Sequence, residues 1–440
     1  MRAKMRLPSW ASTLLIALIV FLLVFFTERL GLMNPYWYQI IQLAAITAIS
    51  ALGLNLIYGF NGQFSLGHIG FYAIGAYGSA LITKDLAANW SGTRIGALSW
   101  MIAGQVGVLA ALFAARVLRL GAIRKRLAGG LAGYLKPYES GLIVLLVTLV
   151  LLAVAIAVGV LATWGLHVVL ATIFKLILFL PQGVAHSLVF LIALITGGTM
   201  AALVAYLVGL PLLRLSSDYF GIATLGFSVM IYTALQNSDQ VIPTMKGARG
   251  MVSIPTWTTW SWVFGALLVV VFIMRHLVHS SYGRAIISIR EDEIAAKTMG
   301  IDAPQLKATA FAVGGFFAGV AGGLYAHLFG FLHPSTFNFI KGFDPLIIIV
   351  FGGLGSMTGT ILASALFALL IEGLRVLLPQ GFEDWRFVIY PIILLLIMLL
   401  RQQGLMATTE WGWLRAPLPP ERDIPVPDRA AQERTQEQEA

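Results

Sequence analysis

Long apolar segments repeat along this chain and are separated by shorter polar stretches. A helix needs about 20 apolar residues to cross the hydrocarbon core of a bilayer. The pattern predicts membrane helices at residues 11–26, 39–57, 98–115, 142–162, 189–208, 218–235, 262–274, 308–329, 343–351, 361–377 and 387–400. Residues 165–180 contain His167 and Lys175, and we expect an interfacial helix there. In total we expect about 10–12 membrane helices, including broken and short ones.

One apolar region is rich in glycine and in polar residues. Residues 58–83 contain Gly62 and Gly67 among Gln63, Ser65 and His68, a pattern typical of a broken helix. Non-helical backbone at membrane depth is tolerated where it is buried in protein or lines a water-filled cavity. The polar groups therefore either face a transport pathway or form structural hydrogen bonds, and the glycines either hinge the chain or permit close helix packing.

Two further glycine patterns indicate close packing and a hinge. Gly315, Gly319 and Gly323 recur at four-residue spacing, so helix backbones can approach along that face. The sequence GGLGSMTG, with Gly352, Gly353 and Gly355, joins two apolar segments. A phosphate-binding loop would need Gly-Lys-Ser or Gly-Lys-Thr, which occurs neither here nor elsewhere in the chain. We therefore expect no ATP hydrolysis by this chain alone.

Composition places the chain among membrane proteins. Of its 440 residues, 58% are hydrophobic and 11% are charged, whereas soluble domains carry about 25% charged residues. These values predict an all-α polytopic membrane protein. The net charge of +9 comes from Lys and Arg in short loops, a pattern that places both termini in the cytoplasm and does not indicate nucleic-acid binding. The chain has no cysteine, nucleophile–base pair or metal-ligand motif, so we expect no enzyme, cofactor or metal site.

The most charged stretch between apolar segments is residues 283–307, GRAIISIREDEIAAKTMGIDAPQLK. A bilayer would exclude these charges at roughly 2.5–3.5 kcal/mol each, so the stretch must lie in water. Residues 292–299 favour a short helix with a Glu293/Lys297 pair, which Gly300 would end, and Asp302 would cap the next helix. The stretch is either a docking element or an ordinary solvated loop that sets the topology.

Three blocks together resemble the permease subunits of branched-chain amino acid ABC importers, of the LivM type. They are GLNLIYGFNGQFSLGHIGFYAIGAYGSALI, LRLSSDYFGIATLGFSVMI, and the region from GRAIISIREDEIAAKTMGID through FAGVAGGLYA to FGGLGSMTG. The resemblance spans roughly residues 52–83 and 208–400. It implies an ABC importer permease architecture in which residues 291–300 form the coupling helix that docks on an ATPase. The coupling residues would be Arg290, Glu291, Asp292, Glu293, Ala295, Ala296 and Gly300.

The resemblance also implies partners and a domain organisation. It implies a homologous sister permease, two ATP-binding cassette subunits that carry ATP and Mg²⁺, a periplasmic solute-binding protein, and location in the bacterial inner membrane. Residues 1–414 would form the permease domain, and residues 415–440, rich in Pro, Glu and Arg, a disordered cytoplasmic tail. Residues 93–182 have no counterpart in the family pattern, which predicts an inserted hairpin with an interfacial helix. The outer sequence TMKGARGM also departs from the family pattern.

The leading hypothesis is therefore a permease for branched-chain or related neutral amino acids. A zwitterionic ligand needs donors and acceptors along its path, and the candidates are Gln63, Ser65, His68, Tyr219 and Thr224. The alternative within the family is import of urea or short-chain amides. A different class is an ion-coupled carrier or channel, for which only His68, Glu372 and Asp344 could lie deep, without an obvious opposite partner.

Overall fold

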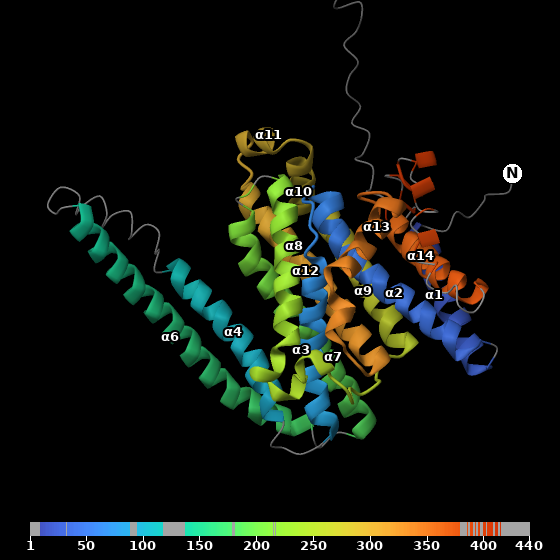
Figure 1. The fold of residues 1–440 in the computed structure, drawn as a ribbon, viewed down its shortest axis with the longest axis horizontal. Helices are drawn as coiled ribbons and strands as arrows, with labels where there is room; N and C mark the ends of the chain where they lie inside the picture. Colours follow the sequence, from blue (N-terminus) through green and yellow to red (C-terminus); the bar gives the residue numbers. More distant parts are fainter. Residues whose placement is uncertain are drawn as a thin grey trace, which may run out of the picture.

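The computed structural model describes residues 9–378, with gaps at 32, 89–94, 118–136, 178–180, 214 and 216 (Figure 1). It also describes scattered positions between 385 and 414. Within this part of the chain, eight helices are long and apolar enough to cross a membrane. The all-α polytopic membrane fold is thereby confirmed. The N-terminal residues 1–8 and the expected tail, residues 415–440, lie outside the described residues, as do half of the last predicted helix at 387–400 and most of the basic loop at 116–136.

The long helices are α1 (Ser9–Arg29), α2 (Pro35–Leu54), α3 (His68–Ala88), α4 (Ile95–Val117), α6 (Pro137–Ile177), α7 (Gln182–Leu212), α8 (Ser217–Gln236), α9 (Trp260–His279), α12 (Ala303–Phe329) and α14 (Met357–Leu377). Shorter α-helices are α10 (Ser281–Glu291), α11 (Glu293–Thr298) and α13 (Phe343–Gly352). A π-helix, η1 (Asn55–Phe60), continues α2, and the 3₁₀ turns are η2 (Ser238–Gln240), η3 (Pro243–Met245), η4 (Gly247–Arg249), η5 (Pro334–Phe337) and η6 (Phe339–Gly342).

Helix α12 lies at the centre of the bundle and packs against α7, α3 and α2 (Figure 1). Its glycines make these close contacts possible. A Cβ atom at Gly315 or Gly319 would lie only 2.6 or 2.7 Å from an alanine Cβ of α7, and one at Gly323 would lie 2.8 Å from a leucine methyl of the same helix. On another side of α12, a Cβ at Gly322 would lie 2.0 Å from the carbonyl oxygen of Tyr72 in α3. The predicted small-residue stripe is thus a packing surface that faces α7.

The expected break in the glycine-rich region lies between η1 and α3. Residues 61–67 are not helical, and Gly62 adopts a φ of +73°, a conformation that favours glycine. The side chain of Asn55 holds the end of α2 to the turn before α14. Its Nδ2 donates to Ser356 O at 3.0 Å and to Thr360 Oγ1 at 2.9 Å, while its Oδ1 accepts from Gly355 N at 3.0 Å. The helix break and the GGLGSMTG turn therefore form one connected unit.

Helices α4 and α6 pack along each other and form an arm that slants away from the bundle (Figure 1). The expectation of a separate interfacial helix at residues 165–180 is wrong, because α6 runs without interruption from Pro137 to Ile177. No proline lies between the two predicted segments, Thr163 Oγ1 donates to Gly159 O within the helix at 2.9 Å, and Gly165 alone does not end a helix. At 41 residues, α6 is about 60 Å long, about twice the thickness of a bilayer's hydrocarbon core.

A segment after α14 returns to the glycine turn. The backbone N–H groups of Leu405 and Met406 donate to Phe351 O at 2.8 Å and to Gly352 O at 3.1 Å. The carboxylate of Glu410 accepts from the N–H of Met357 at 2.5 Å and from the N–H of Thr358 at 3.1 Å. Glu410 thus caps the N-terminus of α14 from a distant part of the chain.

Candidate functional site

The charged segment 283–307 forms three capped helical pieces at one end of the bundle. Ser280 Oγ accepts from Gly283 N at 3.1 Å and caps α10. Asp292 Oδ1 accepts from Ile294 N at 2.8 Å and from Ala295 N at 3.0 Å, so it ends α10 and starts α11. The short helix predicted over residues 292–299 is confirmed as α11, Glu293–Thr298.

Gly300 ends this helix in the way its position predicts. Its φ is +83°, its N–H donates to Lys297 O at 3.0 Å, and the N–H of Ile301 donates to Ala296 O at 3.1 Å. This pair of bonds is the Schellman motif, in which glycine avoids the steric cost of a left-handed residue. Asp302 Oδ1 then accepts from Gln305 N at 3.3 Å and caps α12. The segment therefore has a defined conformation.

Glu293 connects α11 to α12 through two ion pairs. Its Oε1 lies 2.8 Å from Lys297 Nζ, and its Oε2 lies 2.6 Å from Lys307 Nζ. The hydrogen bond from Lys297, followed by that from Lys307, lowers the pKa of the Glu293 carboxyl below its ordinary value of 4.5. Residues 299–302 join α11 to α12, and the ion pair between Glu293 and Lys307 adds a side-chain link between the two helices.

We expect this arrangement to depend on pH in a direction set by Glu293. A carboxyl whose pKa is lowered in the folded state stabilises that state above pH 4.5, and the contribution is lost as pH falls through the lowered pKa. Hydrogen exchange of the α11 amides should therefore be slower in the native chain than in Glu293→Gln at pH 5 to 7. The difference should vanish in acid, and an equal difference at all pH values would contradict the role of the charge.

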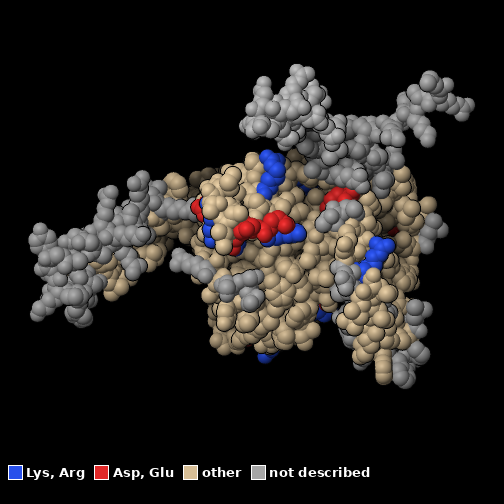
Figure 2. Space-filling view, turned by 90° about the horizontal axis from the view of Figure 1, so that it is seen from above, with Lys and Arg blue, Asp and Glu red and all other residues tan. Residues whose placement is uncertain are grey.

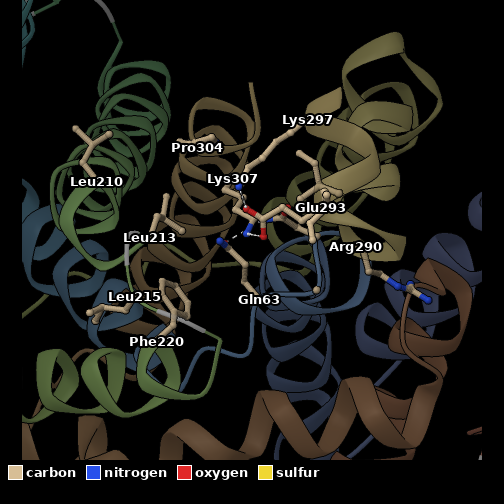
Figure 3. A pocket seen from close by; sticks show the side chains of 14 residues that line it. Gln63, Leu210, Leu213, Leu215, Phe220, Arg290, Glu293, Lys297, Pro304 and Lys307 are labelled. Atoms are coloured by element: carbon tan, nitrogen blue, oxygen red, sulfur yellow. Dashed lines mark hydrogen bonds and ion pairs between the residues drawn. The ribbon is translucent and has the colours of Figure 1, made fainter. Parts of the chain in front are cut away.

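Arg290, at the end of α10, contacts both glycine-rich elements. Its Nη1 donates to the carbonyl oxygen of Gly59 in η1 at 2.5 Å. A Cβ atom at Gly62 would lie 3.0 Å from Arg290 Cγ, and one at Gly355 would lie 3.3 Å from Arg290 Nη1. In Figure 3 the guanidinium points away from the Glu293 cluster, toward these elements. Glu291 also pairs with Arg290 Nε at 3.4 Å, on the exposed side.

A cavity of about 1070 Å³ lies beside α11. Its polar wall includes Gln63, Arg290, Glu293, Lys297 and Lys307, and its apolar wall comes from the end of α7 and the start of α8 (Figure 3). Viewed from the end that carries α11, charged side chains gather near the middle of the visible face, and most of the tan surface around them is uncharged (Figure 2). A charged, hollowed end of this kind suits contact with water or with a soluble partner.

The predicted substrate-path residues are distributed over the helix break, and the structure does not bring all five together. Gln63 lines the cavity and accepts from Asn61 Nδ2 at 3.0 Å. His68 Nε2 lies 2.8 Å from Ser50 O, and Thr224 Oγ1 accepts from Leu66 N at 3.0 Å, so both side chains hold the break against neighbouring helices. Ser65 is buried, and Tyr219 is 66% exposed on the surface of α8.

Two residues that hold the glycine turn and the start of α14, Asn55 and Glu410, were not predicted from the sequence. Asn55 could have been found, because a single amide between Leu54 and Leu56 in an apolar helix indicates a buried hydrogen bond. Glu410 could not have been found from the sequence, since only the fold places it at the start of α14.

Residues 140–399 match the family model described as branched-chain amino acid transport system / permease component. This match includes residues 140–182, part of the expected insertion, and leaves out the first sequence block at 52–83. No solved structure matches the chain.

Curated relatives point to the same family. The chain is 31% identical over 258 residues to the high-affinity branched-chain amino acid transport system permease protein LivM of Escherichia coli, and 30% identical to that of Salmonella typhimurium. Each match covers 51% of this chain and 59% of the relative's length. A probable LivM of Methanocaldococcus jannaschii is 24% identical over 47% of this chain and 66% of its own length. With the helical bundle and the matched region together, the chain belongs to the permease component family of branched-chain amino acid transport systems.

Proposed function

We propose that this chain is the transmembrane permease subunit of an ATP-driven importer for branched-chain amino acids. In this proposal it works with a homologous sister permease, two ATP-binding cassette subunits that bind ATP and Mg²⁺, and a periplasmic solute-binding protein. It lies in a bacterial inner membrane with both termini in the cytoplasm, and it carries no catalytic residues of its own. The similarity to LivM permease proteins and the charged segment 283–307 support the proposal.

The observation that carries the proposal is the double attachment of α11. Glu293 binds Lys307 of α12, and Arg290, three residues before the start of α11, binds the backbone of η1. A partner that displaced α11 would therefore act on the central helix and on the helix break together. Tightly packed elements transmit such a displacement because they shift between discrete arrangements. In this proposal Arg290, Glu291, Asp292, Glu293, Ala295, Ala296 and Gly300 form the ATPase-coupling surface.

Reconstitution tests this function directly. The chain, its sister permease, two ATPases and the binding protein, placed together in liposomes, should import leucine only when ATP is present on the ATPase side. The double variant Glu293→Gln with Gly300→Ala should insert normally but lose import and substrate-stimulated ATP hydrolysis. Full import by that variant would reject the coupling role.

Two other functions give different results in the same system. If the binding protein retains urea or short-chain amides and not leucine, the alternative substrate class is correct. If the chain alone accumulates solute from an ion gradient, it is a carrier.

A further inference from the structure

A second, smaller cavity lies away from the charged end, among α2, α3, α12, α13 and α14. Its volume is about 220 Å³. Its apolar lining includes Leu43, Ile69, Ile348, Phe367, Ala368 and Ile371. Its polar lining includes Ser50, Tyr72, Tyr325, Thr336, Lys341 and Asp344. The lining thus combines an apolar surface with a cation and an anion.

Lys341 and Asp344, the charged pair of this cavity, are only loosely bound to each other. Lys341 Nζ lies 3.5 Å from Asp344 Oδ2, longer than the 2.7–2.9 Å typical of a strong charge-assisted hydrogen bond. Glu372 also lines the cavity, but its carboxylate already accepts from Tyr36 Oη at 2.7 Å and lies 3.6 Å from Arg375 Nη1. Lys341 and Asp344 are therefore the pair able to take a ligand that brings one charge of each sign.

The size of the cavity fits a small ligand. An apolar cavity of about 150 Å³ holds a benzene molecule. A volume of about 220 Å³ is enough for an amino acid with a short branched side chain, and is small for a large aromatic one.

We propose that this cavity binds the transported amino acid as a zwitterion. Asp344 takes the α-ammonium group, Lys341 takes the α-carboxylate, and the branched side chain lies against Ile348 and Ile371. This site rests on the proposed import function, and it specifies the part of the chain at which the amino acid binds. It places the binding residues on η6, α13 and α14, away from Gln63 and the cavity at the charged end.

Because this chain contains no cysteine, a single introduced thiol is the only one in this subunit, and its modification is read on this subunit after the complex is separated. In the complete reconstituted complex, T336C places the thiol in the cavity wall, and S335C places one on the exposed neighbouring residue. Leucine at about ten times its dissociation constant should slow modification of T336C by a small methanethiosulfonate roughly 11-fold, since occupancy leaves only that fraction free. It should leave S335C unaffected.

The charges are tested with leucine analogues in the T336C background. Leucinamide lacks the carboxylate, and 4-methylpentanoate lacks the ammonium group, so neither should protect the thiol as leucine does. Adding D344N should weaken leucine protection about tenfold or more, as expected when a charged hydrogen bond is lost, while improving 4-methylpentanoate relative to leucine. A purely structural role of Asp344 would weaken both ligands equally, and that result would overturn the assignment.

Failure of the site and failure of the function are distinguishable. If the complex imports leucine but leucine does not slow modification of T336C, nor of T47C on the α2 wall, the site is wrong and the function stands. If the complex with the native chain does not import leucine, the proposed function fails and the site falls with it.

Discussion

Complexes that carry Arg290→Ala should still hydrolyse ATP but should import leucine at least about tenfold more slowly than the native complex. The guanidinium is the direct side-chain link between α10 and η1, through the 2.5 Å hydrogen bond to Gly59 O. A hydrogen bond from a charged group contributes about 1.5–3 kcal/mol, which corresponds to roughly tenfold or more in an equilibrium between two arrangements. Without it, movement of α11 would reach α12 through Glu293 but would no longer be transmitted directly to the helix break.

The matched control is Arg284→Ala in the same helix. Arg284 Nη1 donates to His279 O at 2.9 Å, a local contact within the α9–α10 corner, and the residue is exposed. Import rate and ATP hydrolysis should be measured together for both variants, with membrane insertion checked for each. If the Arg284 and Arg290 variants lose import to the same extent, or if Arg290→Ala imports at the native rate, the link to Gly59 does not carry the coupling.

Arg290 also marks where prediction from the sequence ends. Helix α11, its cap at Asp292 and its end at Gly300 could be predicted because the bonds that define them join residues at most five positions apart. The bond between Arg290 and Gly59 spans 231 positions, and nothing in either local sequence specifies the other. The charged segment was therefore found as a helix, whereas its attachment to the helix break was not.

Helix packing also divides into a part that the local sequence predicts and a part that depends on distant residues. The spacing of Gly315, Gly319 and Gly323 correctly predicts a close-packed face, because four-residue spacing keeps side chains on one side of a helix. The identity of the partner, α7, depends on the assembled bundle. The prediction for the arm of α4 and α6 was wrong for a related reason. The polar residues His167 and Lys175 suggested a separate interfacial helix, yet nothing in the local sequence ends α6 before Ile177.

The largest effect on stability is expected from Gly319→Ala in α12. An ideal Cβ at this position would lie 2.7 Å from Ala201 Cβ, 2.9 Å from Gly198 Cα and 3.0 Å from Gly197 O, so it would meet α7 at three atoms that cannot rotate away. Overpacking of this kind costs about 1–3 kcal/mol and more where backbone must move. We expect a clear fall in the thermal unfolding midpoint of the purified chain in lipid nanodiscs, together with a loss of leucine import by the complex.

The same substitution at Gly265 in α9 is the control, because no atom lies within 4 Å of a Cβ built there. Alanine in a helix interior is favoured over glycine by roughly 0.5–1 kcal/mol, so Gly265→Ala should leave the midpoint unchanged or raise it. The two variants differ only in what surrounds one added methyl group. If Gly319→Ala were as stable as Gly265→Ala, α12 and α7 would not be in backbone contact, and α12 could not form the close-packed centre through which displacement of α11 would act on the bundle.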